Sequence, residues 1–157
     1  STYMSIEHNY RVLNVRANFK ENTLENSYWD SYRAENLLKT ISKDMEEANK
    51  LRQSSFESGI EGLVRVINSN KTSNNIVSSY SKVVFKDRLD VLCATKTQSY
   101  EEYRSICELY PDIIQVANRD YDIVFIDVSR RMPEECARKI LDLADVVVIN
   151  ITQRMEI

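Results

Sequence analysis

Asp127 is the residue best placed to do chemistry, because it closes the nearly unbroken apolar run Tyr121–Val128. An acid at the carboxyl end of a buried parallel strand lies where open α/β sheets bind their ligands. In proteins that act on nucleotide phosphates, such an acid holds Mg²⁺ directly or through water. The simpler alternative is that Asp127 only caps the turn after the strand.

The residues Ser129, Arg130 and Arg131 follow Asp127 closely and extend this candidate site. An arginine guanidinium offers paired donors that suit a phosphate, a partner protein or DNA. Exposed arginines on loops are also commonly just solvated, so both interpretations stay open.

Three tyrosines form a second feature, and they are Tyr100, Tyr103 and Tyr110. Their spacing could align them as a stripe on a helix. We expect such rings to pack in the core or against a subunit rather than to stack on a base.

Glycine is unusually scarce, since Gly59 and Gly62 are the only two in 157 residues. A phosphate cradle of the G-x-x-x-x-G-K-[ST] or G-x-G-x-x-G type uses several glycines, so that backbone N–H groups can approach the phosphates. Neither pattern occurs. These residues therefore do not hold nucleotide phosphates with a glycine-rich loop of their own.

The cysteines Cys93, Cys107 and Cys136 are far apart, and His8 is the only histidine. No CxxC pair occurs, so we expect neither a disulfide framework nor a Cys/His zinc site. This usage is typical of the reducing cytoplasm, where we expect the protein to work.

Length and composition favour one globular domain spanning residues 1–157. Hydrophobic residues make up 43% and charged residues 29%, the balance of a soluble fold with a sizeable core. The net charge of −3 gives no general support for nucleic-acid binding. No apolar run of about 18 residues and no secretory signal pattern are visible, so no membrane span or secretion is expected.

The hydrophobic pattern predicts an α/β fold with a mainly parallel sheet flanked by helices. The continuous Val/Ile runs at 121–128 and 144–151 indicate strands covered on both faces, as in a parallel sheet. The expected strands are 11–15, 89–94, 121–128 and 144–151. The expected helices are 32–53, one opening at 59, 73–83 with Thr72 as N-cap, 99–118 broken at Pro111, and one from Pro133 to about 143, and 18–30 is expected to be a loop.

This order of segments resembles the ParA/MinD family of P-loop ATPases. The run Tyr121–Asp127, a helix of about ten residues and Ala144–Ile149 are together similar to the switch II region of that family. Further upstream, Tyr10–Val15 followed by Phe19–Leu24 looks like the family's second strand and switch I loop. Gly59–Leu63 and Leu89–Ala94 resemble later segments of the same core, in the same order.

The resemblance implies a P-loop NTPase-like three-layer sandwich that binds ATP and Mg²⁺. It implies that Asp127 is the metal-associated residue, with Ser129 and Arg130 near the nucleotide and Asn18 at the catalytic switch I position. Proteins of this family dimerise on ATP and position plasmids, septa or surface machinery. A homodimer and a protein partner are therefore expected, whereas the acidic composition does not support nonspecific DNA binding.

Departures from the family pattern leave the activity open. The deviant Walker A motif is absent, Arg16 and Asn18 stand where the family has aspartates, and Val128–Pro133 replaces a proline–glycine turn. Asparagine can coordinate a metal but cannot act as a charged base. The sequence is then either an excerpt of a longer ATPase, the interpretation we favour, or a degenerate relative that has lost hydrolysis.

Two other functions remain as alternatives. One is a non-catalytic protein-interaction scaffold on the same fold. The other is a receiver-like signalling domain, suggested by Asp127 and by Thr152 after the last predicted strand. Receivers need an acidic pair after the first strand, and none follows Val12–Val15, so this alternative is the weaker.

Overall fold

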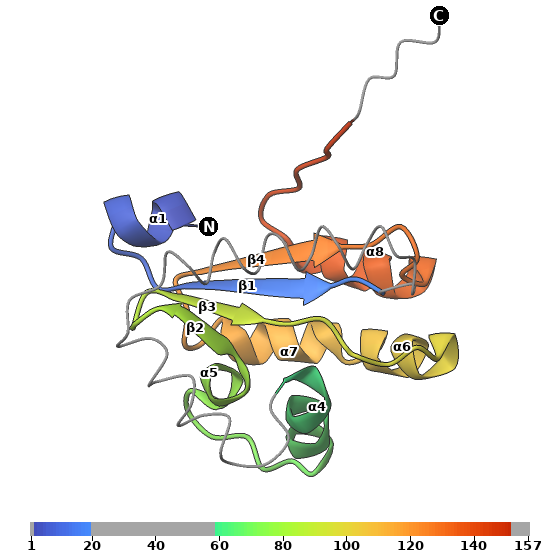
Figure 1. The fold of residues 1–157 in the computed structure, drawn as a ribbon. Helices are drawn as coiled ribbons and strands as arrows, with labels where there is room; N and C mark the ends of the chain where they lie inside the picture. Colours follow the sequence, from blue (N-terminus) through green and yellow to red (C-terminus); the bar gives the residue numbers. More distant parts are fainter. Residues whose placement is uncertain (1, 20–58, 152–157) are drawn as a thin grey trace, which may run out of the picture.

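A four-stranded sheet with strand order β2-β3-β1-β4 organises the chain (Figure 1). The fold was obtained as a computed structural model, which describes residues 2–19 and 59–151. The strands are β1 Val12–Ala17, β2 Lys82–Phe85, β3 Leu89–Leu92 and β4 Ile123–Val128. β1 pairs in parallel with β3 and β4, and β2 pairs antiparallel with β3. The expected α/β class with a mainly parallel sheet is confirmed.

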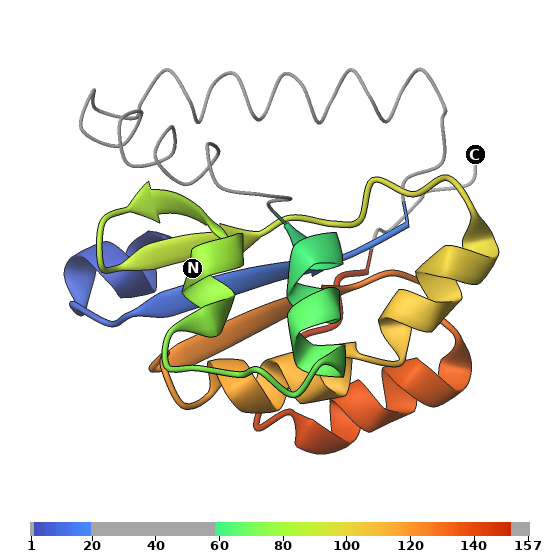
Figure 2. The same ribbon diagram turned by 90° about the horizontal axis from the view of Figure 1, so that it is seen from below.

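The helices α4 to α8 lie over one face of this sheet, as Figure 2 shows. The described helices are α1 Thr2–Glu7, α4 Ile60–Asn68, α5 Ile76–Tyr80, α6 Tyr100–Cys107, α7 Tyr110–Ala117 and α8 Glu134–Leu143. In these ranges no helix combines the length and the apolar character needed to cross a membrane. The predicted helix 32–53 and most of the predicted loop 18–30 lie outside the described residues.

Alternation along β1 decides which side chains form the core. Leu13, Val15 and Ala17 are fully buried against the helices, and Asn14 and Arg16 point to the opposite face and are half-buried. The parallel register extends this division to β4, where Val124, Ile126 and Val128 pack on the same core. Side chains that alternate with these, including Asp127, are thereby directed away from the core.

The predicted break near Pro111 is confirmed as two helices, α6 and α7. Ser99 caps α6, since its Oγ accepts a hydrogen bond from the Glu102 amide at 3.4 Å. The break itself falls at Glu108 and Leu109, and Pro111 lies in the first turn of α7. Proline is tolerated there because that amide has no intrahelical partner.

The predicted helix 73–83 is wrong over most of its length. Thr72 is not its cap; α5 begins after Asn75, whose φ is 59°, and ends at Tyr80. The chain then forms β2, which joins β3 through a tight turn in which Asp87 also has a positive φ of 59°. Pairing with β3 outweighs the helical spacing of the apolar residues here, as is common for Val-rich segments.

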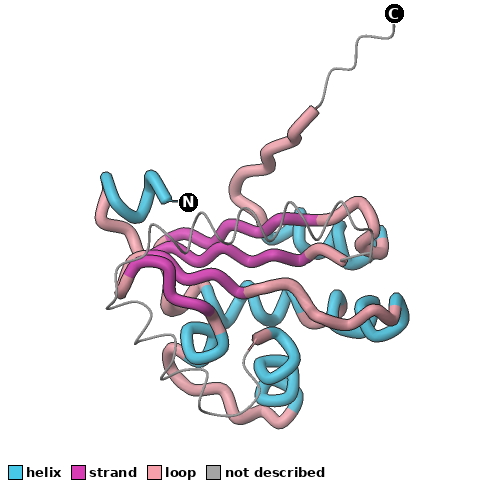
Figure 3. The backbone as a smooth tube through the Cα atoms, viewed as in Figure 1, coloured by secondary structure: helices cyan, strands magenta, loops and turns pink. Residues whose placement is uncertain are grey.

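The predicted buried strand 144–151 is also wrong. The segment is irregular and leaves the body of the molecule after α8, as Figure 3 shows. Its side chains are exposed, with Val146 and Val148 at 78% and Ile151 at 86%. A run of Val and Ile favours burial but does not supply a neighbouring strand. Among the described strands β4 pairs only with β1, so its outer edge is open.

Exposure on β4 corrects a further expectation. The strand was predicted to be covered on both faces of the sheet. This prediction is wrong for the face that carries Phe125, which is 39% exposed, and Asp127, which is also exposed. Pro133 lies one position earlier than expected, as the N-cap of α8 rather than in its first turn.

Candidate functional site at the carboxyl edge of the sheet

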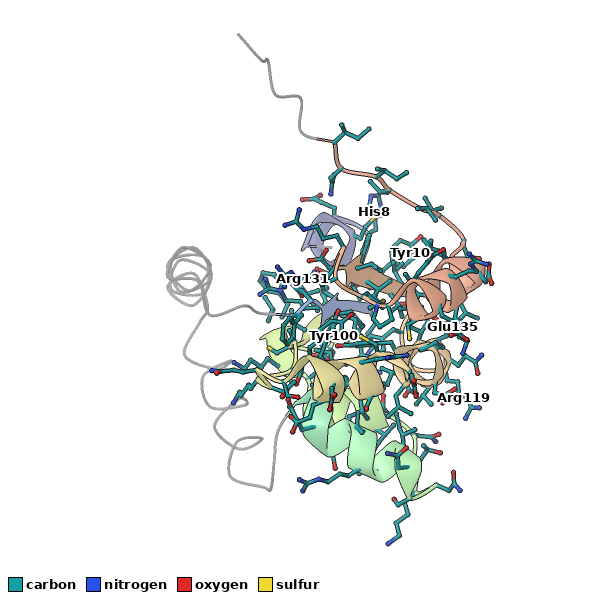
Figure 4. The ribbon with its side chains drawn as sticks, turned by 90° about the vertical axis from the view of Figure 1, so that its right-hand side faces the viewer. His8, Tyr10, Tyr100, Arg119, Arg131 and Glu135 are labelled. Carbon is teal, nitrogen blue, oxygen red and sulfur yellow. The ribbon has the colours of Figure 1, made fainter. Side chains whose placement is uncertain are left out.

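The carboxyl ends of β1, β3 and β4 meet at one edge of the sheet, because the three strands are parallel. This carboxyl edge carries Asn18 after β1, Thr95 after β3, and Asp127 with the Ser129–Arg131 loop at the end of β4. Open α/β sheets bind ligands at this edge. Figure 4 looks toward it, with Tyr100 and Arg131 near the centre of the view.

Asp127 presents an exposed carboxylate at this edge. Its register partner on β1 is Arg16, and paired residues of parallel strands project from the same face. The carboxylate thus has a cationic side chain on the adjacent strand. Because Asp127 lies within β4 and is exposed, its carboxylate is open to solvent and to a ligand beside Arg16.

Asn18 has a buried side-chain oxygen, Oδ1, for which no donor is found among the described residues. Buried polar atoms are nearly always hydrogen-bonded, so an orphaned acceptor calls for a donor or a cation. The structure therefore brings the predicted switch I residue to the same edge as Asp127, with an acceptor for which the described residues supply no donor.

The Ser129–Arg131 loop is an ordered turn leading into α8. Ser129 Oγ accepts a hydrogen bond from the Arg131 amide at 3.2 Å, and the Met132 amide donates to the Ser129 carbonyl at 3.0 Å. Met132 is 6% exposed and anchors the turn in the core. The Arg130 side chain is exposed at the surface of the turn. Ser129 retains its own O–H as a donor, so the turn offers hydroxyl and guanidinium donors beside Asp127.

Glu61 and Thr95 form a contact at this edge that sequence reasoning missed. Thr95 Oγ1 donates to Glu61 Oε1 at 2.6 Å, and the Lys96 amide donates to the same oxygen at 2.9 Å. Burial alone would raise the pKa of Glu61, but these two hydrogen bonds favour the carboxylate, and the net pKa lies below its ordinary value. The contact joins the start of α4 to the loop after β3. The sequence signal was an acid in the first turn after Gly59, which does not identify its partner.

The three tyrosines predicted to pack in the core divide into two groups. Tyr103 and Tyr110 are fully buried, which confirms the expectation for them, and burial raises the pKa of each. Tyr100 differs, because it is 49% exposed at the carboxyl edge. Its ring lies 5.9 Å from that of Phe19, edge to face, and its hydroxyl donates to the Arg131 carbonyl at 3.2 Å.

Metal chemistry at this edge would depend on Asp127 as the principal acid. Within residues 2–19 and 59–151, no three His, Cys, Asp or Glu side chains group in a way that could hold a metal ion. Mg²⁺ needs few protein ligands when substrate phosphates and water complete its shell. One carboxylate and one amide oxygen therefore fit Mg²⁺ only together with a phosphate ligand.

The cysteines lie outside this chemistry. All three are free thiols, and burial raises the pKa of Cys107 to about 11. A thiol with such a pKa is protonated at neutral pH and a poor nucleophile.

Comparison with protein-family models, with curated proteins and with solved structures found no match. We therefore infer function from the residues at the carboxyl edge and from their arrangement.

Proposed function

We propose that this chain is the core of a ParA/MinD-like ATPase that binds ATP and Mg²⁺ at the carboxyl edge. On this proposal the protein dimerises on the nucleotide and positions a cellular structure through a protein partner. The observation that carries the proposal is that Asn18, Asp127, Ser129 and Arg130, all expected from the resemblance, lie at the carboxyl ends of two adjacent parallel strands. No other group of residues in the sequence was expected to bind nucleotide.

The side chains at this edge match the chemistry of a magnesium–nucleotide complex. Asp127 would hold Mg²⁺ directly or through water, and Ser129 and Arg130 would donate hydrogen bonds to phosphate oxygens. The orphaned Oδ1 of Asn18 would receive a donor or a metal-bound water. Bound ATP would supply a phosphoryl group open to attack by water. Because Asn18 is neutral, it would orient groups at the site without acting as a base.

The open edge of β4 is consistent with a P-loop NTPase-like sandwich. In that architecture a further parallel strand, followed by the phosphate-binding loop, pairs beside the strand that ends in the aspartate. Such a strand would pair with β4 and give the apolar segment 146–151 a neighbour to pack on. Gly59 and Gly62 are the only glycines in these 157 residues, so a glycine-rich phosphate-binding loop is not among them.

Calorimetric titration of the native-length protein, meaning the complete natural chain, with ATP tests the proposal. We expect binding that requires Mg²⁺ and that weakens on the order of tenfold in Asp127→Asn, the loss of one charge-assisted contact. Asp142→Asn, which removes an exposed acid on α8, is the matched control and should bind like the wild type. Absence of MgATP binding, or equal binding by both variants, would refute the proposal.

A non-catalytic scaffold is the second candidate, favoured by the register that sets Arg16 beside Asp127 and by the neutral Asn18. An arginine next to the carboxylate competes with a cation for it. This alternative predicts that the native-length protein captures its protein partner equally well with and without MgATP, whereas the ATPase requires nucleotide for capture.

A further inference from the structure

Helix α6 contacts both loops of the carboxyl edge through an aromatic cluster made of Phe19, Tyr100 and Tyr103. Phe19 follows β1, and the two tyrosines lie in the first turn of α6. The ring centroids of Phe19 and Tyr103 are 5.0 Å apart, and those of Tyr100 and Tyr103 are 6.1 Å apart. These separations lie in the range of attractive aromatic contacts.

Tyr103 fixes α6 to the end of β1. Its side chain is fully buried, and its hydroxyl donates to the Ala17 carbonyl at 2.9 Å. Ala17 immediately precedes Asn18, whose side chain belongs to the proposed site. The position of α6 is thereby tied to the backbone that presents Asn18.

Tyr100 extends this attachment to the other loop. Its ring packs against Phe19 on one side, and its hydroxyl reaches the Arg131 carbonyl at the other, at 3.2 Å. Figure 4 shows the labelled Tyr100 and Arg131 near each other at this edge. One side chain therefore contacts the loop after β1 and the loop after β4, although these loops are more than one hundred residues apart in sequence.

We propose that Tyr100 is a positioning residue that couples Asn18 and Phe19, directly after β1, to the Ser129–Arg131 turn after β4, so that a ligand which holds one of these segments also holds the other. The contacts that provide this coupling are present in the protein without a ligand. Only the response to a ligand rests on the proposed nucleotide function. The hydroxyl acts on the Arg131 backbone and the ring acts on Phe19, so the two halves can be removed separately.

Trypsin cleavage after Arg130 and Arg131 of the native-length protein reports on the loop after β4. Tyr100→Phe keeps the ring and removes only the hydrogen bond, and we expect cleavage there about three- to tenfold faster, the effect of one ordinary hydrogen bond. Cleavage at Lys86 and Arg88, in the turn at the far end of the sheet, is the internal control and should not change. Unchanged cleavage after Arg131 in Tyr100→Phe would overturn the proposal.

A double-mutant cycle tests the coupling itself. Phe19→Leu removes the ring that contacts both Tyr100 and Tyr103 but leaves the Tyr100 hydrogen bond to Arg131 in place. We expect it to speed cleavage after Arg131 severalfold in the wild type but not in a Tyr100→Leu background. Equal effects of Phe19→Leu in both backgrounds would mean that Tyr100 contributes only general stability, and the coupling would be refuted.

Adding MgATP separates this proposal from the proposed function. Protection of Arg131 in the wild type that is lost in Tyr100→Leu supports both. Protection that is equal in the two proteins refutes the coupling and leaves the nucleotide function standing. If Phe19→Leu and Tyr100→Leu are non-additive but MgATP does not change cleavage after Arg131, the result supports the coupling and counts against the nucleotide function.

Discussion

Replacing Tyr121 with phenylalanine should destabilise the protein by about 2 kcal/mol, mainly because it removes a buried hydrogen bond to a carboxylate, together with the contact of the hydroxyl with Ser78. The Tyr121 hydroxyl donates to Asp90 Oδ2 at 2.6 Å, and the two residues are only 6% and 5% exposed. Burial, and then the charge of Asp90, raises the pKa of this hydroxyl, so it remains a donor at neutral pH. The phenylalanine ring would keep its packing and its contact with the Arg11 guanidinium, which lies 4.7 Å from the ring centroid.

Urea denaturation followed by circular dichroism measures this effect. The midpoint should fall with an unchanged slope, and the melting temperature should drop by about 4–8 °C for a domain of this size. Tyr10→Phe removes a hydroxyl from a ring that is 43% exposed, and this control should change the free energy of unfolding by less than about 0.5 kcal/mol. Equal stability of Tyr121→Phe and Tyr10→Phe would refute the reasoning.

A cycle with Asp90→Asn assigns the lost free energy to the pair. If the contact is responsible, the double variant should be less destabilised than the sum of the two single variants. Strict additivity would show that Tyr121 and Asp90 act independently, contrary to the geometry.

Three further predictions concern charge, exposure and thiol reactivity. Because the pKa of Glu61 is lowered from 4.5 in the folded state, its stabilising contribution is present above that pH and is lost as the pH falls through the folded-state pKa. Glu61→Gln should therefore flatten the acid limb of a stability–pH curve, and an unchanged limb would contradict the assignment. In the isolated 157-residue chain, Val148→Lys should leave the free energy of unfolding within about 0.5 kcal/mol and reduce concentration-dependent association in sedimentation, since Val148 is 78% exposed; a large loss of stability would mean that the segment is buried in this chain. At neutral pH, an alkylating reagent followed by peptide mass mapping should modify half-buried Cys93 before buried Cys107, and the reverse order would be inconsistent with the structure.

The sequence predicted strands at β1 and β4 well because each carries closely spaced β-branched and other apolar residues. Their parallel arrangement brings Asn18 and Asp127 to one edge of the sheet. The break between α6 and α7 was also readable, since a proline inside a helical pattern marks a boundary.

The errors arose where the presence or absence of a pairing strand decides the outcome. The segment 82–85 carries a helical pattern but pairs with β3 through a turn, and the turn depends on the positive φ of Asp87. The segment 146–151 has the composition of a central strand, but composition alone does not provide a neighbour at the edge of β4. Local pattern therefore located most of the elements but not β2, and it predicted a strand at 144–151 for which no described strand is a partner.

The contacts that shape the candidate site were beyond local pattern as well. Glu61 meets Thr95 only because α4 begins beside the loop after β3. The contact between Tyr100 and the Arg131 backbone likewise depends on where α6 lies against β1. Residue types identified the candidate ligands at the carboxyl edge, and tertiary structure identified the residues that position them.

Amide hydrogen exchange of the native-length protein, measured with and without MgATP, tests the central claim most directly. The account predicts that MgATP protects residues 16–19 and 127–131, the two segments at the carboxyl edge, and leaves the turn at 86–88 unchanged. Protection confined to other parts of the molecule, or no protection at all, would contradict the claim that this edge binds nucleotide.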